Sequence, residues 1–339
     1  MNTCTSMRSC RRCADQQVVL GKHYADPPTT RTCLPNTAQR LLNMTTSTTT
    51  LIDTFAEAFS MWGARLLITA DTPSWAMISA QSVTGFATSI IGCKCEAGIE
   101  RILPPEETPD GRPGVSVLLF TVKSDDMTKR LLERIGQCIL TCPTTACFNG
   151  LTHDAREFVD VGGQLRFFGD GYQMSKQLNG RRYWRIPVMD GEFLVEETFG
   201  IKKAVGGGNL LILGRATRDT LRATEAAVVA MREVPGVILP FPGGIVRSGS
   251  KTGSKYKTLF ASTNDAYCPT LRGFAPNTQL PPEAGCVLEI VIDGLDLPAV
   301  EESMRRGIHA ASAAGALQIT AGNYGGKLGQ FQIHLHSLI

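Results

Sequence analysis

The feature of this 339-residue sequence that most constrains its fold is a repeated alternation of short apolar runs with amphipathic segments. In the first half, residues 64–70, 89–95 and 114–122 are typical of strands, and residues 74–85 and 125–140 are typical of helices. In the second of these helices, apolar residues recur every fourth position, so they share one buried face. Such a chain is predicted to pack helices against a sheet.

The same order returns in the second half of the chain. We expect strands at residues 209–213, 236–239, 286–292 and 318–321, and helices at 217–232 and 298–311. Strand–helix–strand twice per half is the split βαβ arrangement of ferredoxin-like folds. The predicted fold class is therefore α+β, with two ferredoxin-like lobes and a β-rich insertion between them.

The predicted domains follow from this pattern. The N-terminal lobe covers residues 51–203 and includes the aromatic-rich, strand-like insertion at 162–203, and the C-terminal lobe covers residues 204–339. Gly206, Gly207 and Gly208 precede a strand instead of following one, unlike the glycines of a dinucleotide fingerprint. We interpret them as a hinge or a tight turn leading into the second lobe.

Residues 1–50 differ in composition from the rest of the chain. The first 43 residues carry six basic and two acidic side chains, show almost no periodicity, and lead into a threonine run. We predict a disordered tail or a mis-called start, with Met44 as the alternative first residue. A transit-type leader is the remaining alternative, because the segment is basic and poor in acids.

The charge of the remaining chain argues against one class of partner. The whole sequence has 34 basic and 31 acidic residues, but residues 44–339 hold 28 basic and 29 acidic ones. A body without a basic excess gives no indication of nucleic-acid binding. No apolar run approaches the ~20 residues that span a membrane, so we expect a cytoplasmic protein without a membrane partner.

Eleven cysteines are the most conspicuous residues, but they form no recognisable site. Cys10 and Cys13 have half the spacing of a zinc site, and no second pair follows at a matching interval. In a chain of this size we expect reduced thiols, with Cys268 as the one candidate nucleophile. His334 and His336 are expected to lie exposed on one face of a strand, with metal binding as the alternative. We predict no metal site.

Residues 243–252 look like a phosphate-binding loop at first sight. They do not match one, because Ser250 separates Lys251 from the glycine that should directly precede the lysine. A Gly/Ser turn that carries Arg247, Lys251 and Lys255 is either a cradle for anionic groups or an ordinary solvated loop.

Four further segments, residues 104–111, 167–172, 262–269 and 321–329, place polar side chains among glycines and aromatics. We expect these segments to line a cleft. Glu289 stands inside an apolar strand, where alternation turns its side chain either to solvent or inward. An inward glutamate has a raised pKa and is a usable proton donor.

These segments also carry a resemblance to a known family. The motifs are DTFAEAF at residues 53–59, PPEETPDGRPG at 104–114, FFGDGY at 167–172, FPGGIV at 241–246, ASTNDAYCPT at 261–270 and AGNYGGKLG at 321–329. With them, the chain closely resembles the formylmethanofuran–tetrahydromethanopterin formyltransferases from about residue 53 to residue 336. Residues 1–50 have no counterpart in archaeal members, and the cysteine enrichment departs from the family pattern.

The resemblance implies a one-carbon enzyme. Family members transfer a formyl group between the amine of methanofuran and N5 of tetrahydromethanopterin, without a metal or a covalent intermediate. Both carriers are substrates, and no tightly bound cofactor is expected. The resemblance further implies a dimer or tetramer with its site in a cleft between subunits. In methylotrophic bacteria, the homologue is a subunit of a formyltransferase/hydrolase complex.

Direct transfer needs both carriers in line, a stabilised tetrahedral oxyanion and a proton for the departing amine. Glu289 resembles a glutamate that the family places near the reacting centre, so we expect it to handle this proton. Asn264 and Asn323 are the further catalytic candidates, as oxyanion donors or orienting groups, a role that Tyr324 can share. Lys251, Lys255 and Lys327 are expected to meet the glutamyl tail of the furan carrier. The other predicted substrate-binding residues are Asp170, Tyr172, Gly243, Gly244, Thr263 and Asp265.

Two alternatives remain open at this point. The chain could be a non-catalytic scaffold or small-molecule-binding subunit of a formyltransferase/hydrolase complex, as ferredoxin-like lobes often are. It could instead transfer an acyl group through the thiol of Cys268. Alkylation separates the two from direct transfer, because a thiol mechanism would lose activity and a scaffold would have none at the start.

Overall fold

The computed structural model describes residues 49–339. The predicted tail of residues 1–50, including Cys10, Cys13 and Met44, therefore lies outside the described residues except for its last two positions. Of these, Thr50 begins strand β1 (Thr50–Leu51), which pairs in parallel with β15 (Gln318–Thr320).

Within the described residues, fourteen strands form one mixed sheet and two more form a separate hairpin. Besides β1 and β15, the strands of the large sheet are β2 (Phe55–Thr69), β3 (Glu96–Leu103), β4 (Gly114–Thr121), β5 (Ala146–Asn149), β6 (Glu157–Asp160), β7 (Met174–Leu178), β8 (Arg181–Val188), β9 (Gly191–Glu196), β10 (Thr198–Gly214), β11 (Val237–Ile238), β14 (Cys286–Gly294) and β16 (Phe331–His334). The hairpin consists of β12 (Lys251–Thr252) and β13 (Ala261–Ser262).

The helices are α1 (Pro73–Thr84), α2 (Ile90–Cys93), α3 (Ser124–Arg134) with a π-helical continuation (Ile135–Ile139), α4 (Gly162–Leu165), α5 (Thr217–Arg232) and α6 (Leu297–Ala313). Short 3₁₀ turns lie at Pro105–Glu107, Arg166–Gly169, Pro242–Gly244, Asp265–Tyr267, Pro269–Leu271 and Leu335–Leu338.

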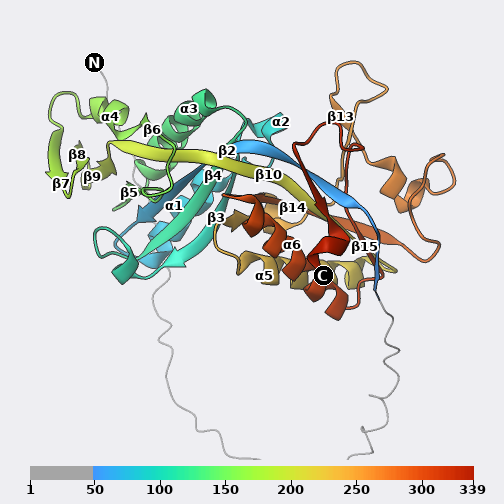
Figure 1. Ribbon diagram of the computed structural model, residues 1–339. Coiled ribbons are helices and arrows are strands. Elements are labelled where there is room, and N and C mark those ends of the chain that lie inside the picture. Colours follow the sequence, from blue (N-terminus) through green and yellow to red (C-terminus); the bar gives the residue numbers. More distant parts are fainter. Residues whose placement is uncertain (1–48) are drawn as a thin grey trace, which may run out of the picture. The chain divides into compact units, whose positions relative to one another are not determined.

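Two long antiparallel strands, β2 and β10, form the middle of the sheet (Figure 1). Their register sets Ala64 opposite Ile201 and Phe59 opposite Gly206. Along the first half of the sheet, β2 pairs with β4 and β5. Further along the sheet, β10 pairs with β14 and β15. The two halves of the described chain therefore share one continuous sheet.

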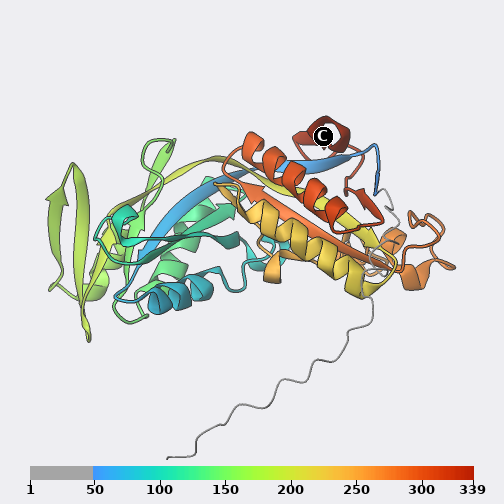
Figure 2. The same ribbon diagram turned by 90° about the horizontal axis from the view of Figure 1, so that it is seen from below.

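Each half of the sheet has its own helices. In the first half, α1 and α3 pack against β4 and β2, and in the second half α5 and α6 pack on each other and on β14 and β10. Figure 2 shows α5 and α6 side by side across the strands. Local capping fixes where these helices begin: Thr72 accepts the N–H of Trp75 before α1, and Asp296 accepts that of Ala299 before α6.

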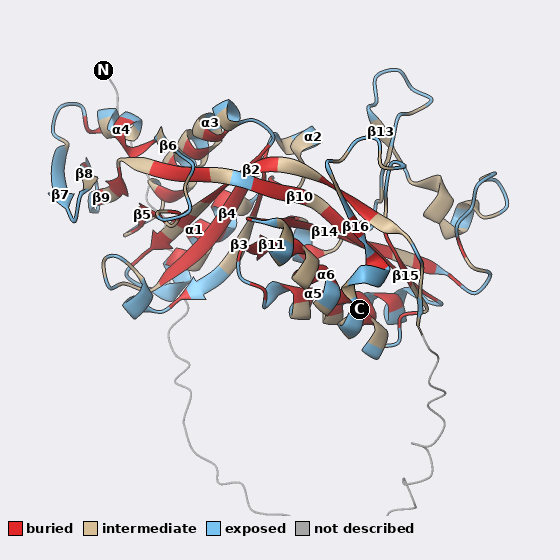
Figure 3. Ribbon diagram, in the orientation of Figure 1, coloured by how far each residue is buried: buried red, intermediate tan, exposed pale blue. Residues whose placement is uncertain are grey.

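The buried side chains follow the sheet. One apolar cluster includes Leu66, Ile68 and Leu131 in the first half, and a second includes Leu210 and Ile290 in the second half. A smaller cluster joins them where β2 and β10 pair, with members Met61, Leu118, Phe120, Leu151, Ala204, Ile238 and Leu295. Figure 3 shows the resulting contrast between the buried central strands and the exposed loop that carries β13.

The four helices predicted at residues 74–85, 125–140, 217–232 and 298–311 are confirmed, and the fold is mixed α and β as predicted. The strand predicted at residues 89–95 is wrong. Ile90–Cys93 forms the short helix α2, Lys94 takes the left-handed conformation with φ 68°, and the strand begins only at Glu96. Ile91 stays exposed, so the apolar run did not indicate burial in a strand.

The interpretation of Gly206–Gly208 as a hinge or turn is also wrong, since the three glycines lie inside β10. They form a bulge in its pairing with β14, and Gly207 has a φ of 83°. A side chain at Gly206 would collide with the sulfur of Met61, which explains the glycine there. The predicted boundary between residues 203 and 204 likewise falls within this strand.

His334 and His336 do not share a strand face. His334 ends β16, and a 3₁₀ turn begins at Leu335, so His336 is no longer in a strand. Both residues are exposed, as expected. Among the helices of residues 49–339, none combines the length and the apolar character needed to cross a membrane.

Candidate functional site

Glu289 lies on β14, on the face of the sheet opposite α5 and α6. The strand alternates: Leu288, Ile290 and Ile292 are buried, and the latter two pack in the cluster that contains the helices. Glu289 shares the other face with Leu211, its partner on β10, and the segment between residues 246 and 285 covers that face. Of the two orientations that the sequence left open, the structure has the inward one.

The carboxyl of Glu289 has an unusual proton affinity. Burial raises its pKa from an ordinary glutamate value to about 7, because the surrounding protein disfavours the charged form. The side chain keeps some exposed surface, and that surface belongs to a cavity wall. A group of this kind can both take up and release a proton near neutral pH.

The cavity beside Glu289 has a volume of about 770 Å³. Its polar lining includes Arg247, Asn264, Tyr267 and Cys268. The backbones of Val246 and Glu289 are joined by two hydrogen bonds of 2.7 and 2.9 Å, which fix the Gly/Ser loop to the strand. Two predicted catalytic residues, Glu289 and Asn264, therefore share one cavity.

A second hollow of about 500 Å³ lies around the β12–β13 hairpin. The predicted binding residues Lys251, Lys255, Thr263 and Asp265 line it. Nζ of Lys251 contacts Oδ1 of Asp265 at 2.7 Å, and this hydrogen bond holds the pKa of Asp265 below its usual value. Lys255 is exposed and is the freer cation of the two for an anionic ligand.

The turn that contains Gly243 and Gly244 leads into this region. Both glycines have positive φ angles, 65° and 85°. A side chain at Gly244 would press on Leu239 and Val228, whereas Gly243 faces open space. Gly243 thus leaves room for a ligand to approach the backbone, and Gly244 serves the packing of the turn.

The loop of residues 321–329 reaches the same site from the other side of β10. Asn209 on β10 brackets Gly322, accepting its N–H at 2.5 Å and donating to its carbonyl at 2.9 Å. Burial raises the pKa of the Tyr324 hydroxyl, and the negative charges of Glu289 and Glu57 raise it further. Tyr324 therefore lies within electrostatic reach of Glu289.

The other two predicted residues of this loop have different surroundings. The Asn323 amide donates to Thr54 Oγ1 at 3.2 Å and to the carbonyl of Phe55 at 3.1 Å, and its oxygen accepts the N–H of Gly325. These hydrogen bonds hold the loop onto the start of β2. Lys327 is exposed.

Sequence reasoning missed Glu57, which lies within the DTFAEAF motif. Glu57 is 1% exposed on β2, and its carboxylate accepts four backbone N–H groups of the 321–329 loop. The available signal was a glutamate between apolar residues of a strand, Ala56 and Ala58, which is the signal that identified Glu289.

The expectation that four polar segments line one cleft is wrong for a single chain. Segment 262–269 lines the cavity beside Glu289, and Tyr324 of segment 321–329 lies within electrostatic reach of Glu289, but 104–111 and 167–172 lie in the first half. Phe55 and Thr69, the ends of β2, are about 45 Å apart for an extended strand, which gives the scale of the separation. Asp170 is exposed with a φ of 49°, and Tyr172 is 78% exposed.

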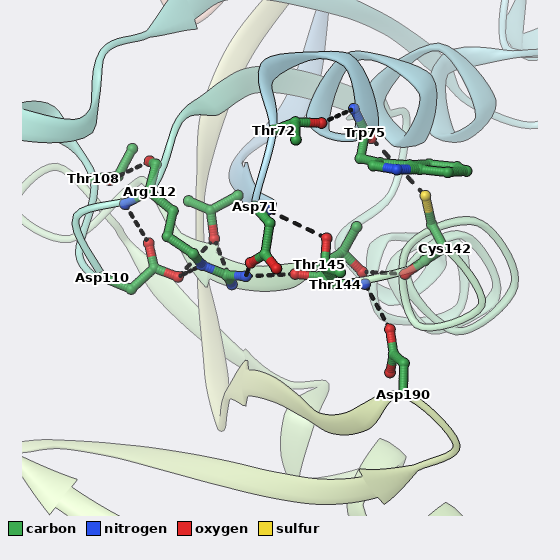
Figure 4. Close-up of polar contacts among 11 residues, drawn as sticks. Asp71, Thr72, Trp75, Thr108, Asp110, Arg112, Cys142, Thr144, Thr145 and Asp190 are labelled. Atoms are coloured by element: carbon green, nitrogen blue, oxygen red, sulfur yellow. Dashed lines mark hydrogen bonds and ion pairs between the residues drawn. The ribbon is translucent and has the colours of Figure 1, made fainter.

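Arg112 organises the first of these distant segments (Figure 4). Its guanidinium donates to Asp110 Oδ2 and Asp71 Oδ1, both at 2.9 Å, and to the carbonyl of Thr144 at 2.5 Å. The N–H of Thr144 in turn donates to Asp190 at 2.7 Å, in the turn between β8 and β9. The segment is thus tied to its own half of the sheet.

Metal ligands are not clustered in the part of the chain that the structure describes: between residues 49 and 339 no three His, Cys, Asp or Glu side chains are grouped to hold an ion. Cys268 lines the cavity, with its sulfur 3.3 Å from both Thr263 Oγ1 and the carbonyl oxygen of Asn264. The polar residues of the cavity lining are therefore chemically diverse, with the carboxyl of Glu289, the guanidinium of Arg247, the amide of Asn264 and the thiol of Cys268.

Comparison with known families shows to which family the chain belongs. Residues 44–188 match the family described as formylmethanofuran-tetrahydromethanopterin formyltransferase, and residues 191–338 match its proximal lobe. The chain belongs to this family. The predicted resemblance is confirmed, as is the prediction of a formyltransferase enzyme, so the non-catalytic alternative is not supported.

Individual relatives agree with the family assignment. The chain is 57% identical over 296 residues to the formylmethanofuran–tetrahydromethanopterin formyltransferase of Methylobacillus flagellatus, covering 86% of this chain and 98% of the relative. It is 57% identical over 297 residues to a subunit of the formyltransferase/hydrolase complex of Methylorubrum extorquens, covering 85% of this chain and 94% of that relative.

Solved structures of the formyltransferase family have the same fold. The formyltransferase of Methanosarcina barkeri superposes with a TM-score of 0.82 at 49% identity, covering 86% of this chain and 98% of that one. A chain of the formyltransferase/hydrolase complex from Methylorubrum extorquens, crystallised with methylofuran, also gives 0.82, at 56% identity and covering 85% and 96%.

Proposed function

We propose that the cavity beside Glu289 transfers a formyl group between the amine of methanofuran and N5 of tetrahydromethanopterin, in one-carbon metabolism. The observation that carries the proposal is the Glu289 carboxyl, whose pKa of about 7 makes it a proton carrier in a cavity wall. The relatives are named for these two carriers, which supports the choice of substrates.

The reaction we propose needs no protein nucleophile. The acceptor nitrogen attacks the formyl carbon and forms a tetrahedral oxyanion, while the Glu289 carboxylate takes the proton that the nitrogen loses. The intermediate collapses by breaking the bond to the donor nitrogen, and the same carboxyl returns the proton to that leaving amine. Holding the two carriers in line supplies a large share of the rate.

Two side chains near Glu289 are suited to donate a hydrogen bond to the oxyanion. The Asn264 amide lines the cavity, and the raised pKa of Tyr324 keeps its hydroxyl protonated as a donor. Asn323 remains a predicted catalytic residue, although its amide is engaged within its own loop.

The carriers also need binding groups. We propose that Gly243, Thr263 and Lys255 contact the carriers around the β12–β13 hairpin, with Lys255 and Lys327 meeting the anionic tail of the furan carrier. We propose that Lys251 and Asp265 bind the carriers as an ion pair. Gly244 supports the turn by its close packing. Neither carrier is a tightly bound cofactor in this scheme, and no metal takes part in it.

Asp170 and Tyr172 lie in the half of the sheet away from Glu289. In our proposal, they therefore contact a carrier that is bound beside Glu289 of a second copy of the chain. We therefore propose that the chain forms dimers or tetramers with the site between subunits, in the cytoplasm. The Methylorubrum relative belongs to a formyltransferase/hydrolase complex, which supports the same membership for this chain.

We further propose that the two halves are ferredoxin-like lobes, residues 51–203 and 204–339, with the β-rich insertion in the first. Each half has a pair of helices against its part of the sheet, which fits the split βαβ arrangement. The two family models meet between residues 188 and 191, close to this boundary.

The direct test is Glu289→Gln. We expect kcat for formyl transfer to fall about 10²- to 10⁴-fold, because the amide cannot carry the proton, while both carriers bind with unchanged Kd. Stopped-flow turnover and calorimetric binding measure the two quantities. Near-normal turnover with intact binding would contradict the role of Glu289.

A further inference from the structure

Glu57 on β2 is held by one loop alone. Its Oε1 accepts the N–H groups of Leu328 at 2.6 Å and Gly329 at 2.5 Å, and its Oε2 accepts those of Tyr324 at 2.6 Å and Gly326 at 3.0 Å. Burial of the carboxyl opposes ionisation, but these four donors outweigh it and lower the pKa of Glu57 below its ordinary value.

The shape of this loop requires an anion at its centre. Gly325 and Gly326 both have a φ of 72°, and the N–H groups of Tyr324 and Gly326, on either side of that of Gly325, converge on Oε2 of Glu57. A side chain at Gly329 would collide with the carbonyl oxygen of Ala58 and with Glu57 itself, so glycine permits the close approach. Converging N–H groups repel one another unless a negative charge lies between them.

Other side chains anchor the loop mainly toward its two ends, and Asn323 also accepts the N–H of Gly325 while its amide donates to Thr54 and Phe55. Asn209 fixes Gly322 at one end, and the side chain of Gln330 accepts the N–H of Ser60 at 2.8 Å at the other. Between these ends, the backbone N–H groups of Tyr324, Gly326, Leu328 and Gly329 all donate to Glu57. Four of the N–H groups in the middle of the loop therefore depend on the side chain of Glu57.

Tyr324 connects this loop to the reaction site, because the loop directly follows Thr320, and Thr320 and Glu289 are the two strand partners of Leu211 on β10. Its ring lies 6.4 Å from that of Phe59, and its N–H is one of the four that Glu57 holds. We propose that Glu57 is a positioning residue, an internal anion that folds the loop and thereby sets Tyr324 beside Glu289. The kinetic consequence rests on the formyl-transfer function proposed above, whereas the structural consequence does not.

The first test compares Glu57→Gln with a matched control, Glu196→Gln. Glu196 is also a buried carboxylate, 4% exposed, but its partners are Arg181 and the N–H of Asn149 in the first half. In Glu57→Gln, the side-chain NH₂ faces two N–H donors. We expect amide hydrogen exchange at Tyr324, Gly326, Leu328 and Gly329 to accelerate about 10- to 100-fold, with β10 and β14 unchanged.

The same variants give a kinetic comparison. We expect kcat of Glu57→Gln to fall about 10-fold or more, and kcat of Glu196→Gln to stay near that of the wild type even if its Tm falls. Undiminished protection of the four amides in Glu57→Gln would overturn the proposal. If the wild type itself fails to transfer a formyl group, the proposed function fails, and the exchange measurement still tests Glu57.

A second test replaces the anion. Glu57→Ala removes the carboxylate and leaves space for a small one, so added acetate should restore both amide protection and kcat, about 5-fold or more over the unsupplemented variant. Sodium chloride at equal ionic strength should restore neither amide protection nor kcat. Absence of recovery with acetate, or equal recovery with chloride, would contradict the role of a carboxylate at this position.

Discussion

At the scale of single residues, Glu57 and Glu289 have the same sequence signal and different environments. Each interrupts an apolar strand, and each is enclosed by protein. Burial alone raises the pKa of Glu289 to about 7, whereas four N–H donors that lie 267 to 272 positions further along the chain keep Glu57 charged. The sequence shows a carboxylate inside each apolar strand but could not predict its charge, because the donors that decide the charge of Glu57 come from a distant loop.

Cys268 gives a prediction that separates direct transfer from a thiol mechanism. Its sulfur lies in the cavity wall, hydrogen-bonded to Thr263 and Asn264, and direct transfer does not use it. We expect Cys268→Ala to keep kcat within about 3-fold of the wild type, since it loses only weak hydrogen bonds. A steady-state assay measures this. A loss of several orders of magnitude in a folded variant would instead support covalent catalysis.

Asn323 shows a different limit of sequence reasoning. A polar residue among glycines indicated a ligand-binding group, and in the structure the amide of Asn323 hydrogen-bonds with Thr54, Phe55 and Gly325. In a glycine-rich loop, the backbone itself needs hydrogen-bond partners, and short polar side chains supply them locally. Composition cannot separate this use from contact with a substrate.

At the scale of secondary-structure elements, the apolar and amphipathic patterns were sufficient to predict the four long helices. They failed at residues 89–95, where the helix α2 is one turn long and a left-handed residue, Lys94, ends it. The lengths of β2 and β10 were also underestimated. Their outer parts contain polar and small residues such as Glu57, Lys202 and Gly206, which pair with neighbouring strands without forming an apolar run.

A buried carboxyl pair between β14 and β3 predicts how stability depends on pH. Asp293 is 0% exposed, and its Oδ1 accepts the N–H of Gly207 at 3.0 Å. Burial and the neighbouring Glu96 carboxyl raise the pKa of Asp293 well above its usual range. The folded protein therefore binds this proton more tightly than the unfolded chain does. The associated stability is complete below the unfolded pKa of about 4 and is lost as pH rises through the folded pKa.

Asp293→Asn should reduce this dependence, because an amide cannot ionise. We expect the free energy of unfolding to fall less between pH 5 and pH 9 in the variant than in the wild type, as measured by urea titration at both values. Asp219→Asn, at an exposed position on α5, is the control. Its free energy of unfolding should change between pH 5 and pH 9 as much as that of the wild type. If the free energy of unfolding of Asp293→Asn fell with pH as much as that of the wild type, Asp293 would be ionised in the folded protein.

At the scale of the whole described chain, the sequence could predict the fold class but not the single sheet. The strand–helix order and the motifs were visible, and they led to two lobes separated near residue 203. The continuity of β10 across that position depends on its pairing with β2 and β14, and such long-range pairing leaves no local signal. For the same reason, the segments expected in one cleft are divided between the two halves.

The reaction site that we propose lies in the second half of the sheet. The cavity, Glu289, Asn264 and the loop held by Glu57 all lie there, while the Arg112 network stabilises the far half. In our proposal, the proton chemistry of the enzyme depends on one carboxyl in this half, that of Glu289.

The pH profile of kcat/KM in wild type and Glu289→Gln tests this claim most directly. The carboxylate must be free to accept a proton from the attacking nitrogen, so kcat/KM of the wild type should rise with pH and level off above about 7, following the pKa of Glu289. The residual activity of Glu289→Gln should lack this step. An inflection near pH 7 that persists in Glu289→Gln would contradict the assignment of the proton-carrying group to Glu289.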